Sequence, residues 1–348
     1  MQHGEVSVGS PGVSVCSASR FNRSSTCSFP SAYRTISLDM KFFSVYSREK
    51  LPQGAVSHAW KDGLIMNTLR SVIKENDIII APGAYDVVSA EIIEKEGFDV
   101  VYISGLGVEA SDIGRPDIGL TTETEITRRA SKIVQSVNKP VICDADTGYG
   151  GLKNVWQTAR DFEAIGVSAI HIEDQTFPKR CGALPGKGVV SLDEYVKKLK
   201  VMLDARRSDD FLVIARTDAK ILGIDEVIKR LKTYAGVGAD MVFLGDFYTK
   251  DEYKQIVDEV NAPIIACDNA FMPCEQPIFT REEWKEIGIK MVIYWALPLF
   301  TAMKAITKAL RTLKEKGTVV EMRDEIFSYE EYGKIVELQR WLDFDGRY

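Results

Sequence analysis

Histidine is scarce in this chain: its 348 residues include only three, His3, His58 and His171. So few imidazoles argue against a histidine-based catalytic triad and against a histidine-rich zinc site. The six cysteines are scattered and form no C-x-x-C pair, so a disulfide framework is not expected either. The chemistry of the protein must then rest on carboxylates, lysines, arginines, a thiol or a metal ion.

The chain also lacks a basic excess and a long apolar run. Lysine and arginine number 44 against 50 aspartates and glutamates, and the net charge of −6 argues against a general nucleic-acid-binding surface. No apolar run approaches the roughly 20 residues that span a bilayer. We therefore expect no nucleic-acid partner and no membrane partner. Small acidic ligands stay open, because local charge decides whether they bind.

Residues 1–60 differ in composition from the rest. They are rich in serine, carry more basic than acidic side chains, and show no sustained periodicity. That composition is typical of a targeting segment or a disordered extension. A start codon assigned too far upstream is a second explanation, with Met40 and Met66 as candidate true starts. We expect a cytoplasmic protein, or a mitochondrial or other organellar one if residues 1–60 are a transit peptide.

From residue 62 onward, short apolar runs alternate with amphipathic helical stretches. The expected strands are 78–82, 100–104, 140–144, 169–173, 211–217, 241–245, 263–267 and 291–295. Helical patterns fill the intervals, for example at 87–96, 155–165, 192–205, 224–235, 280–287 and 297–314. The segments "GFD", "GVSA", "GADM" and "GIKM" each place a glycine after a helix and before the next strand, as a helix C-cap requires.

Eight such units predict an α/β fold of the (β/α)8 TIM-barrel type. Strands that are apolar throughout indicate a parallel sheet covered on both faces. An open doubly wound sheet is the alternative, but no G-x-G-x-x-G follows the first strand. We assign residues 61–315 to the barrel and 316–348 to an extra C-terminal helical arm. The apolar side chains of this arm need a surface to cover and so predict an intersubunit contact.

Polar residues gather where the predicted strands end, which is where such barrels place their active sites. We expect all of these groups to face one cavity. The segments concerned are "YISGLG" (102–107), "DADTGYG" (144–150), Glu173 with Asp174, Arg216 to Asp218, Asp246, and Asp268 with Asn269.

Three carboxylates in this set predict a divalent metal site. Asp144 and Asp146 are two residues apart, so on an extended chain both would point to the same side, and Glu173 comes from the next strand. Carboxylates in one low-dielectric pocket repel each other unless a cation joins them. An all-oxygen set of ligands suits Mg²⁺ or Mn²⁺. Helix capping or pairing with arginine is the alternative for these acids.

The segment "PKRCGALPGKG" (178–188) follows the fourth strand and is too polar and glycine-rich to be core. It predicts a mobile loop that closes over the site. Lys179 and Arg180 would supply positive charge for an anionic substrate and would lower the pKa of Cys181. A thiol so placed can donate a proton to a carbanion. The alternative for an isolated cysteine is a small buried apolar residue, which is how we interpret Cys143 and Cys267.

Taken together, the motifs resemble the isocitrate lyase and phosphoenolpyruvate mutase superfamily over residues 62 to about 315. The resemblance implies a (β/α)8 barrel, Mg²⁺ dependence, and a homotetramer in which neighbours exchange the last helix. Within the family, "KRCG" marks the carbon–carbon lyase branch, such as 2-methylisocitrate lyase. The shared motifs are "GAYDVVSA" (83–90), "YISGLGV" (102–108), "RPDIGL" (115–120), "DADTGYG" (144–150), "IEDQ" (172–175), "PKRCG" (178–182) and "ARTDA" (215–219).

The resemblance also implies roles for individual residues. Cys181 would be the acid that protonates the leaving enolate, with Lys179, Arg180 and Gly182 beside it in the same motif. The metal would be held, directly or through water, by Asp144, Asp146 and Glu173. The substrate would be contacted at its 2-oxo-acid end by Tyr102, Ser104, Gly105 and Leu106, at its oxygens by Arg216, near the metal's outer shell by Asp117, and at a second carboxylate by Asn269.

The sequence departs from the lyase pattern at three positions. Ala183 replaces a histidine, Gly245 replaces a glutamate, and Met272 stands where an N-x-x-E motif has its glutamate. In the family these positions help to hold the distal carboxylate or the lid. We therefore expect a smaller or less charged substrate than a tricarboxylate.

The leading hypothesis is a Mg²⁺-dependent lyase that cleaves a 2-hydroxy di- or tricarboxylate, similar to 2-methylisocitrate, into a pyruvate-like 2-oxo acid and a carboxylic acid. A phosphonomutase or an oxaloacetate hydrolase of the same superfamily is the first alternative. A catalytically silent barrel kept for binding or assembly is the second.

Overall fold

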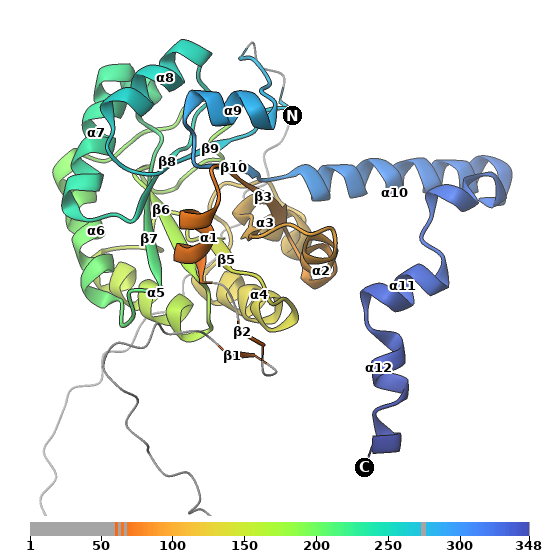
Figure 1. Ribbon diagram of the computed structural model, residues 1–348. Coiled ribbons are helices and arrows are strands. Elements are labelled where there is room, and N and C mark those ends of the chain that lie inside the picture. Colours follow the sequence, from red (N-terminus) through yellow and green to blue (C-terminus); the bar gives the residue numbers. More distant parts are fainter. Residues whose placement is uncertain (1–59, 62–63, 66–67, 273–275, 348) are drawn as a thin grey trace, which may run out of the picture. The chain divides into compact units, whose positions relative to one another are not determined.

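Eight parallel strands close into a barrel (Figure 1), in the order β10-β3-β4-β5-β6-β7-β8-β9. The computed structural model describes residues 60–61, 64–65, 68–272 and 276–347, so all but the last residue of the predicted extension at 1–60 lies outside the described residues. The predicted (β/α)8 barrel is confirmed. Its strands are β3 (Ile79–Ala84), β4 (Val101–Ile103), β5 (Val141–Asp144), β6 (Ala169–Glu173), β7 (Leu212–Thr217), β8 (Met241–Leu244), β9 (Ile264–Cys267) and β10 (Met291–Tyr294), preceded by a short antiparallel pair, β1 (Trp60–Lys61) and β2 (Leu64–Ile65).

Helices follow the strands around the barrel. Several begin with a capping box, in which a threonine and a glutamate three residues later exchange hydrogen bonds, as Thr122 and Glu125 do. The four glycines predicted as C-caps, at 97, 166, 238 and 288, all have φ between 85° and 114°, which only glycine adopts readily. The helices are α1 (Leu69–Glu75), α2 (Val87–Lys95), α3 (Gly105–Ile113), α4 (Glu123–Ser136), α5 (Leu152–Ala164), α6 (Leu192–Ala205), α7 (Ile224–Val237), α8 (Lys250–Glu259), α9 (Arg281–Ile287), α10 (Leu297–Lys316), α11 (Tyr329–Ile335) and α12 (Leu338–Leu342), with 3-10 turns at Ala219–Leu222, Val320–Glu325 and Asp345–Arg347.

The apolar side chains form two cores, because successive residues of a strand point to opposite faces of the sheet. In β7, Leu212 and Ile214 belong to the core inside the barrel, whereas Val213 and Ala215 pack under the helices. This alternation explains why the strands are apolar throughout. None of the helices that the structure describes is long and apolar enough to cross a membrane.

The C-terminal region is helical, as expected, and it leaves apolar side chains uncovered. Helix α10 exposes Met303, Ile306 and Leu310 to 55%, 57% and 61%. Farther along, Lys95 of α2 donates a hydrogen bond of 2.8 Å to the carbonyl of Lys334 in α11. The predicted intersubunit contact of this arm stays a prediction.

Candidate active site

A small cavity, about 40 Å³ in volume, lies at the carboxyl ends of the barrel strands. Eight of the fourteen residues predicted for the site line it, together with two of the three positions that depart from the lyase pattern. The predicted residues are Tyr102, Ser104, Leu106, Asp117, Asp144, Cys181, Gly182 and Arg216, the departures are Ala183 and Gly245, and the others are Phe243, Phe247, Cys267 and Trp295.

The ends of β4 and β5 build one polar side of this cavity. Ser104 follows β4 directly and caps α3, accepting a hydrogen bond of 3.2 Å from the Gly107 amide. Gly105 lies against Asp144, because a β-carbon at position 105 would be 2.8 Å from Asp144 Oδ2. Only glycine therefore lets the α3 backbone approach the carboxylate so closely.

The three predicted metal ligands are all buried beside this cavity. The expectation that Asp144 and Asp146 sit on one extended strand is wrong, because β5 ends at Asp144 and Asp146 has a left-handed backbone with φ 47°. A turn brings the two together instead: the Asp146 amide donates to Asp144 Oδ1 at 3.0 Å. Glu173 ends β6, and its carboxylate is 1% exposed.

Electrostatics at these acids fit a divalent cation. Burial raises the pKa of Glu173 well above its usual range, and burial with the charges of Asp144 and Asp117 raises the pKa of Asp146 to about 7. Neither oxygen of Glu173 accepts a hydrogen bond from any group among the described residues. Arg216 lies 3.0 Å from one Glu173 oxygen, and Lys179 lies 2.6 Å from Asp146, so two cations of the chain already offset part of this charge. Buried carboxylates of this kind hold protons, pair with cations or share a metal ion.

The spacing of the acids limits how a metal would be held. Within the described residues, no three histidine, cysteine, aspartate or glutamate side chains converge closely enough to enclose an ion. Mg²⁺ keeps several of its waters and commonly takes only one or two carboxylates directly. The residues present therefore fit a hydrated Mg²⁺ bound at Asp144, Asp146 and Glu173, partly through water.

Residues 177–188, here called the lid loop, cover the mouth of the barrel. The loop is held at its root by Gln175, whose side chain donates to the Arg180 carbonyl at 2.8 Å and accepts from the Arg180 amide at 3.1 Å. The Cys181 amide donates to the Asp117 carbonyl at 2.9 Å. At its far end, Lys187 Nζ lies 3.0 Å from Asp218 and 2.5 Å from Asp246.

The two cations of the loop do not supply free charge to the cavity, contrary to expectation. Lys179 is buried and pairs with Asp117 and, at 2.6 Å, with Asp146. Arg180 is exposed and its guanidinium donates to the Pro185 carbonyl at 3.2 Å. Lys179 thus neutralises part of the acidic cluster, and Arg180 points away from the site.

Cys181 lines the cavity, but the predicted lowering of its pKa is wrong. Burial under the lid loop raises the pKa of the thiol to about 12, and the charge of Asp117 adds to this, while the Ala183 amide, Lys179 and Arg216 oppose it. The group is therefore a protonated thiol at neutral pH. A protonated thiol is a proton donor and a poor nucleophile.

Arg216 ends its strand in the middle of an ion-pair network. Its guanidinium lies 3.0 Å from Glu173 Oε2 and donates to both oxygens of Asp218 at 2.9 and 3.1 Å. Burial alone would raise the pKa of Asp218. The positive charges of Arg216 and Lys187 outweigh this effect and hold the pKa of Asp218 at about 2. The network presents the guanidinium to the cavity in a fixed orientation.

His171 is a buried member of the site that the sequence interpretation missed. Its Nε2 lies 2.9 Å from the Tyr102 hydroxyl, and its Nδ1 lies 3.7 Å from Asp144 Oδ1. Burial lowers the pKa of His171 to about 4, so the ring is neutral. A signal was available, because His171 and Glu173 alternate along β6 and a histidine facing a barrel interior is an unusual core residue.

Not every strand-end group faces the cavity. Asp174 is fully buried outside the barrel wall, where it accepts hydrogen bonds from Thr217, Tyr234 and Arg230 at 2.7 to 2.9 Å. Asn269 donates to the Gln276 carbonyl at 3.0 Å and is not among the lining residues. Asp246 accepts a hydrogen bond from Lys187 of the lid loop instead of facing the cavity. The expectation of one common cavity is therefore wrong for these groups.

Comparison with known proteins shows one consistent relationship. Residues 69–314 match the family model described as phosphoenolpyruvate phosphomutase. The chain is 36% identical to a 2,3-dimethylmalate lyase of Eubacterium barkeri over 81% of its own length and 99% of that protein. It is also 36% identical to a 2-methylisocitrate lyase of Aeropyrum pernix, over 77% of this chain and 86% of that one.

Solved structures extend the comparison to other reactions. An oxaloacetate acetylhydrolase in complex with the inhibitor 3,3-difluorooxalacetate superimposes with a TM-score of 0.75 at 34% identity, covering 80% of this chain and 95% of that one. A phosphonopyruvate hydrolase in complex with oxalate and Mg²⁺ has a TM-score of 0.72 at 27% identity, covering 80% and 97%. Proteins similar to this chain thus include lyases and hydrolases.

Proposed function

The chain belongs to the phosphoenolpyruvate mutase/isocitrate lyase superfamily, and we propose that within it the chain is a Mg²⁺-dependent carbon–carbon lyase. Its substrate would be a 2-hydroxy dicarboxylate or tricarboxylate, and its products a 2-oxo acid and a carboxylic acid. Both the 2,3-dimethylmalate lyase and the 2-methylisocitrate lyase to which it is similar carry this kind of activity in their names.

The observation that carries the proposal is the protonated thiol of Cys181 in the cavity wall. In such a cleavage, a base removes the C2 hydroxyl proton, the C2–C3 bond breaks, and its electron pair moves to C3 as an enolate of the neighbouring carboxylate. The oxygen left on C2 becomes the carbonyl of the 2-oxo acid. Cys181 gives its proton to C3, and the hydroxyl proton later restores the thiol, so protons balance.

The polar side of the cavity supplies the rest of the chemistry. Arg216 faces the oxygens of the 2-oxo acid, and the neutral His171 fixes the hydroxyl of Tyr102 at the same side. Asp144, Asp146 and Glu173 would hold Mg²⁺, which stabilises negative charge on substrate oxygens when bound. The lid loop excludes water, which would otherwise protonate the enolate without control.

The test is the pair Cys181→Ser and Cys181→Ala with 2,3-dimethylmalate and 2-methylisocitrate as substrates and Mg²⁺ present. We expect wild-type protein to release pyruvate, and both variants to lose about 10²- to 10⁴-fold in kcat because the proton donor is gone. Calorimetry with oxalate and Mg²⁺ should give the same affinity for all three proteins. Equal turnover in wild type and variants would refute the role of Cys181.

A second candidate is hydrolysis of the carbon–carbon bond of oxaloacetate. The cavity is small, at about 40 Å³, and the chain resembles an oxaloacetate acetylhydrolase as closely as it resembles the lyases. The hydrate of oxaloacetate carries the same hydroxyl and carboxylate groups on C2, so the same residues would act on it. Release of oxalate and acetate from oxaloacetate, without pyruvate from either lyase substrate, would favour this candidate. Conversion of phosphonopyruvate would instead favour a mutase.

A homotetramer with exchanged C-terminal helices is part of the same proposal. The uncovered side chains of α10, among them Met303, Ile306 and Leu310, support it, because a row of apolar residues at helical spacing is normally covered. Light scattering after size exclusion tests it. A Leu310→Asp variant should shift the protein to a smaller assembly, while Lys304→Asp, on the same helix, should shift it less.

A further inference from the structure

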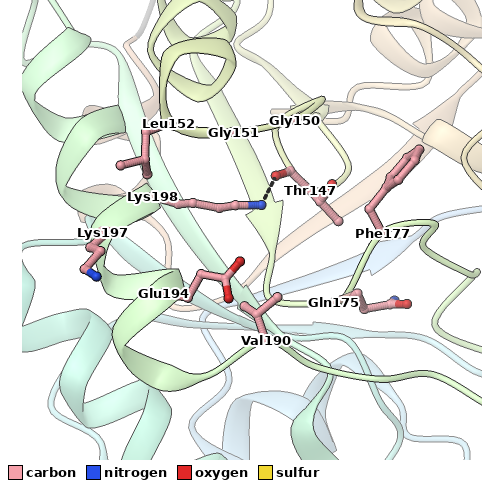
Figure 2. Close-up of a pocket in the computed structure, with 10 residues that line it drawn as sticks. All are labelled: Thr147, Gly150, Gly151, Leu152, Gln175, Phe177, Val190, Glu194, Lys197 and Lys198. Carbon is pink, nitrogen blue, oxygen red and sulfur yellow. Dashed lines mark hydrogen bonds between the residues drawn. The ribbon is translucent and has the colours of Figure 1, made fainter.

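A second cavity, of about 350 Å³, lies outside the barrel mouth (Figure 2). It sits between the turn that follows β5, the root of the lid loop and helix α6, and it shares no lining residue with the cavity at the mouth. Its volume falls in the range of small-molecule sites, roughly 300 to 1,000 Å³. The lining residues are Thr147, Gly150, Gly151, Leu152, Gln175, Phe177, Val190, Glu194, Lys197 and Lys198.

The notable group in this cavity is the ammonium of Lys198. The side chain is about nine-tenths buried, and Figure 2 shows it extended among the lining residues toward Thr147, to whose carbonyl it donates at 3.0 Å. No ion pair within the described part of the chain includes Lys198. A buried cation with one carbonyl partner is unfavourable unless an anion joins it.

The charges around Lys198 leave room for such an anion. Burial lowers the pKa of Lys198, and Glu194, one turn earlier on α6, opposes this only in part. Lys197 stands exposed at the rim, and Gln175 adds an uncharged amide. The charged groups that line the cavity are thus two lysines and one glutamate, which give a net charge of +1.

The remaining walls are apolar and determine the shape of the ligand. The cavity is lined by the apolar side chains of Leu152, Phe177 and Val190, and two glycines form part of its edge. An inorganic phosphate would gain nothing from these walls, whereas an organic acid would bury its hydrocarbon part on them. We propose that this cavity binds a small organic monocarboxylate, with its carboxylate on Lys198 and its apolar body against Leu152, Phe177 and Val190.

The test titrates sodium butyrate into the full chain by calorimetry or saturation-transfer NMR. We expect a Kd on the order of 1 mM, which is realistic for a ligand of six heavy atoms. Lys198→Met should weaken binding by about tenfold or more, because the anion loses its cation. Lys200→Met removes an exposed lysine two residues along the same helix and should leave the affinity unchanged. Butyramide, which lacks the charge, should not bind.

A second variant keeps the test valid if Lys198→Met unfolds the protein. Leu152→Trp fills the cavity from the first turn of α5, where Leu152 is 42% exposed, and should abolish butyrate binding while the unfolding temperature and turnover stay the same. The proposal is overturned if wild-type protein shows no saturable binding. It is overturned equally if Lys198→Met and Leu152→Trp bind butyrate as wild type does, or if phosphate binds as tightly as butyrate.

Discussion

Gly182 of the lid loop and Gly245 after β8 touch across the mouth of the barrel: a β-carbon on residue 182 would lie 2.6 Å from the Gly245 carbonyl oxygen. A β-carbon on residue 245 would meet Arg216 Nε and Asp218 Oδ2, also at 2.6 Å. Glycine at position 182 therefore lets the lid loop lie against the backbone of residue 245. Glycine at position 245 leaves room for the side chains of Arg216 and Asp218.

Replacing Gly182 by alanine should keep the lid loop from closing. The obstructing atom is backbone, which cannot move aside as a flexible side chain would. We expect kcat to fall by about a hundredfold, the usual scale for a misplacement of about 1 Å, with little change in unfolding temperature. Steady-state kinetics and thermal denaturation measure the two effects.

The control for this variant is Gly236→Ala. Gly236 lies in α7 with no neighbouring atom within 4 Å of the added carbon, and alanine favours helix by about 1 kcal/mol over glycine. Its activity should match wild type. A Gly182→Ala protein with wild-type kcat would show that closure does not depend on the Gly182–Gly245 contact.

The reactivity of Cys181 should report its raised pKa. With a pKa of about 12, the thiol loses its proton only far above neutral pH, so at pH 8 almost none of it is thiolate. We expect iodoacetamide to alkylate Cys181 about a hundredfold more slowly than free cysteine. Mass spectrometry of the peptide that contains Cys181 follows the rate. Alkylation faster than that of free cysteine would contradict the raised pKa. It would instead support the lowered pKa that the neighbouring cations alone suggest.

Magnesium should stabilise the protein more at pH 8 than at pH 5.5. The pKa of Asp146 is about 7 in the folded chain and near 3.8 when unfolded, so the folded state binds this proton more tightly. Stability from this group is fully present below about pH 3.8 and is lost as the pH rises from there to about 7, where the Asp146 carboxylate becomes charged in the folded chain. A cation offsets that loss, and below pH 7 it must compete with the proton.

The measurement is the unfolding temperature with excess Mg²⁺ or with EDTA, because a ligand that binds the folded state raises the unfolding temperature. Asp146→Asn should remove most of the shift at pH 8. Asp161→Asn, an acid on the outer helix α5, is the control and should keep it. An equal shift at both pH values would contradict the raised pKa.

The site should discriminate strongly between substrates that carry two carboxylates and substrates that carry three. We expect kcat/KM for 2,3-dimethylmalate to exceed that for 2-methylisocitrate by about tenfold or more, because a third carboxylate would enter a region walled by Phe247 and Trp295 without a free cation. Three cations near the mouth each have two acidic partners already: Lys179 has Asp117 and Asp146, Arg216 has Glu173 and Asp218, and Lys187 has Asp218 and Asp246. Competition assays with both substrates measure the ratio directly. A preference for the tricarboxylate would contradict this interpretation of Ala183 and Gly245.

The sequence was informative wherever a local pattern determines the structure. Apolar runs bounded by glycine predicted the eight strands, and their ends correctly gathered Tyr102, Ser104, Asp144 and Arg216 at one cavity. Periodicity and capping depend on neighbours in the chain, so they can be recognised without coordinates. The polar, glycine-rich composition of 178–188 predicted the loop, and the family motif supported the role of its cysteine.

The errors came from contacts between distant segments. Lys179 and Cys181 are two residues apart, yet Lys179 forms ion pairs with Asp117 and Asp146. The lid loop also buries the thiol, and this burial raises the pKa of Cys181. Burial and pairing of this kind depend on tertiary structure, which no count of neighbouring charges reports. Asp174 was misplaced for a simpler reason, since the residue after Glu173 necessarily points to the opposite face of β6.

Lys187 ties the far end of the lid loop to Asp218 and Asp246, and Asp218 also orients Arg216. Any opening of the lid loop at this end would have to separate the Lys187 ammonium from two carboxylates and return it to water. Buried ion pairs respond weakly to added salt but strongly to loss of one member. The rate of turnover would then depend on how often the ion pairs of Lys187 break. A substitution at residue 187 would change that rate, although its side chain is not among the groups that react.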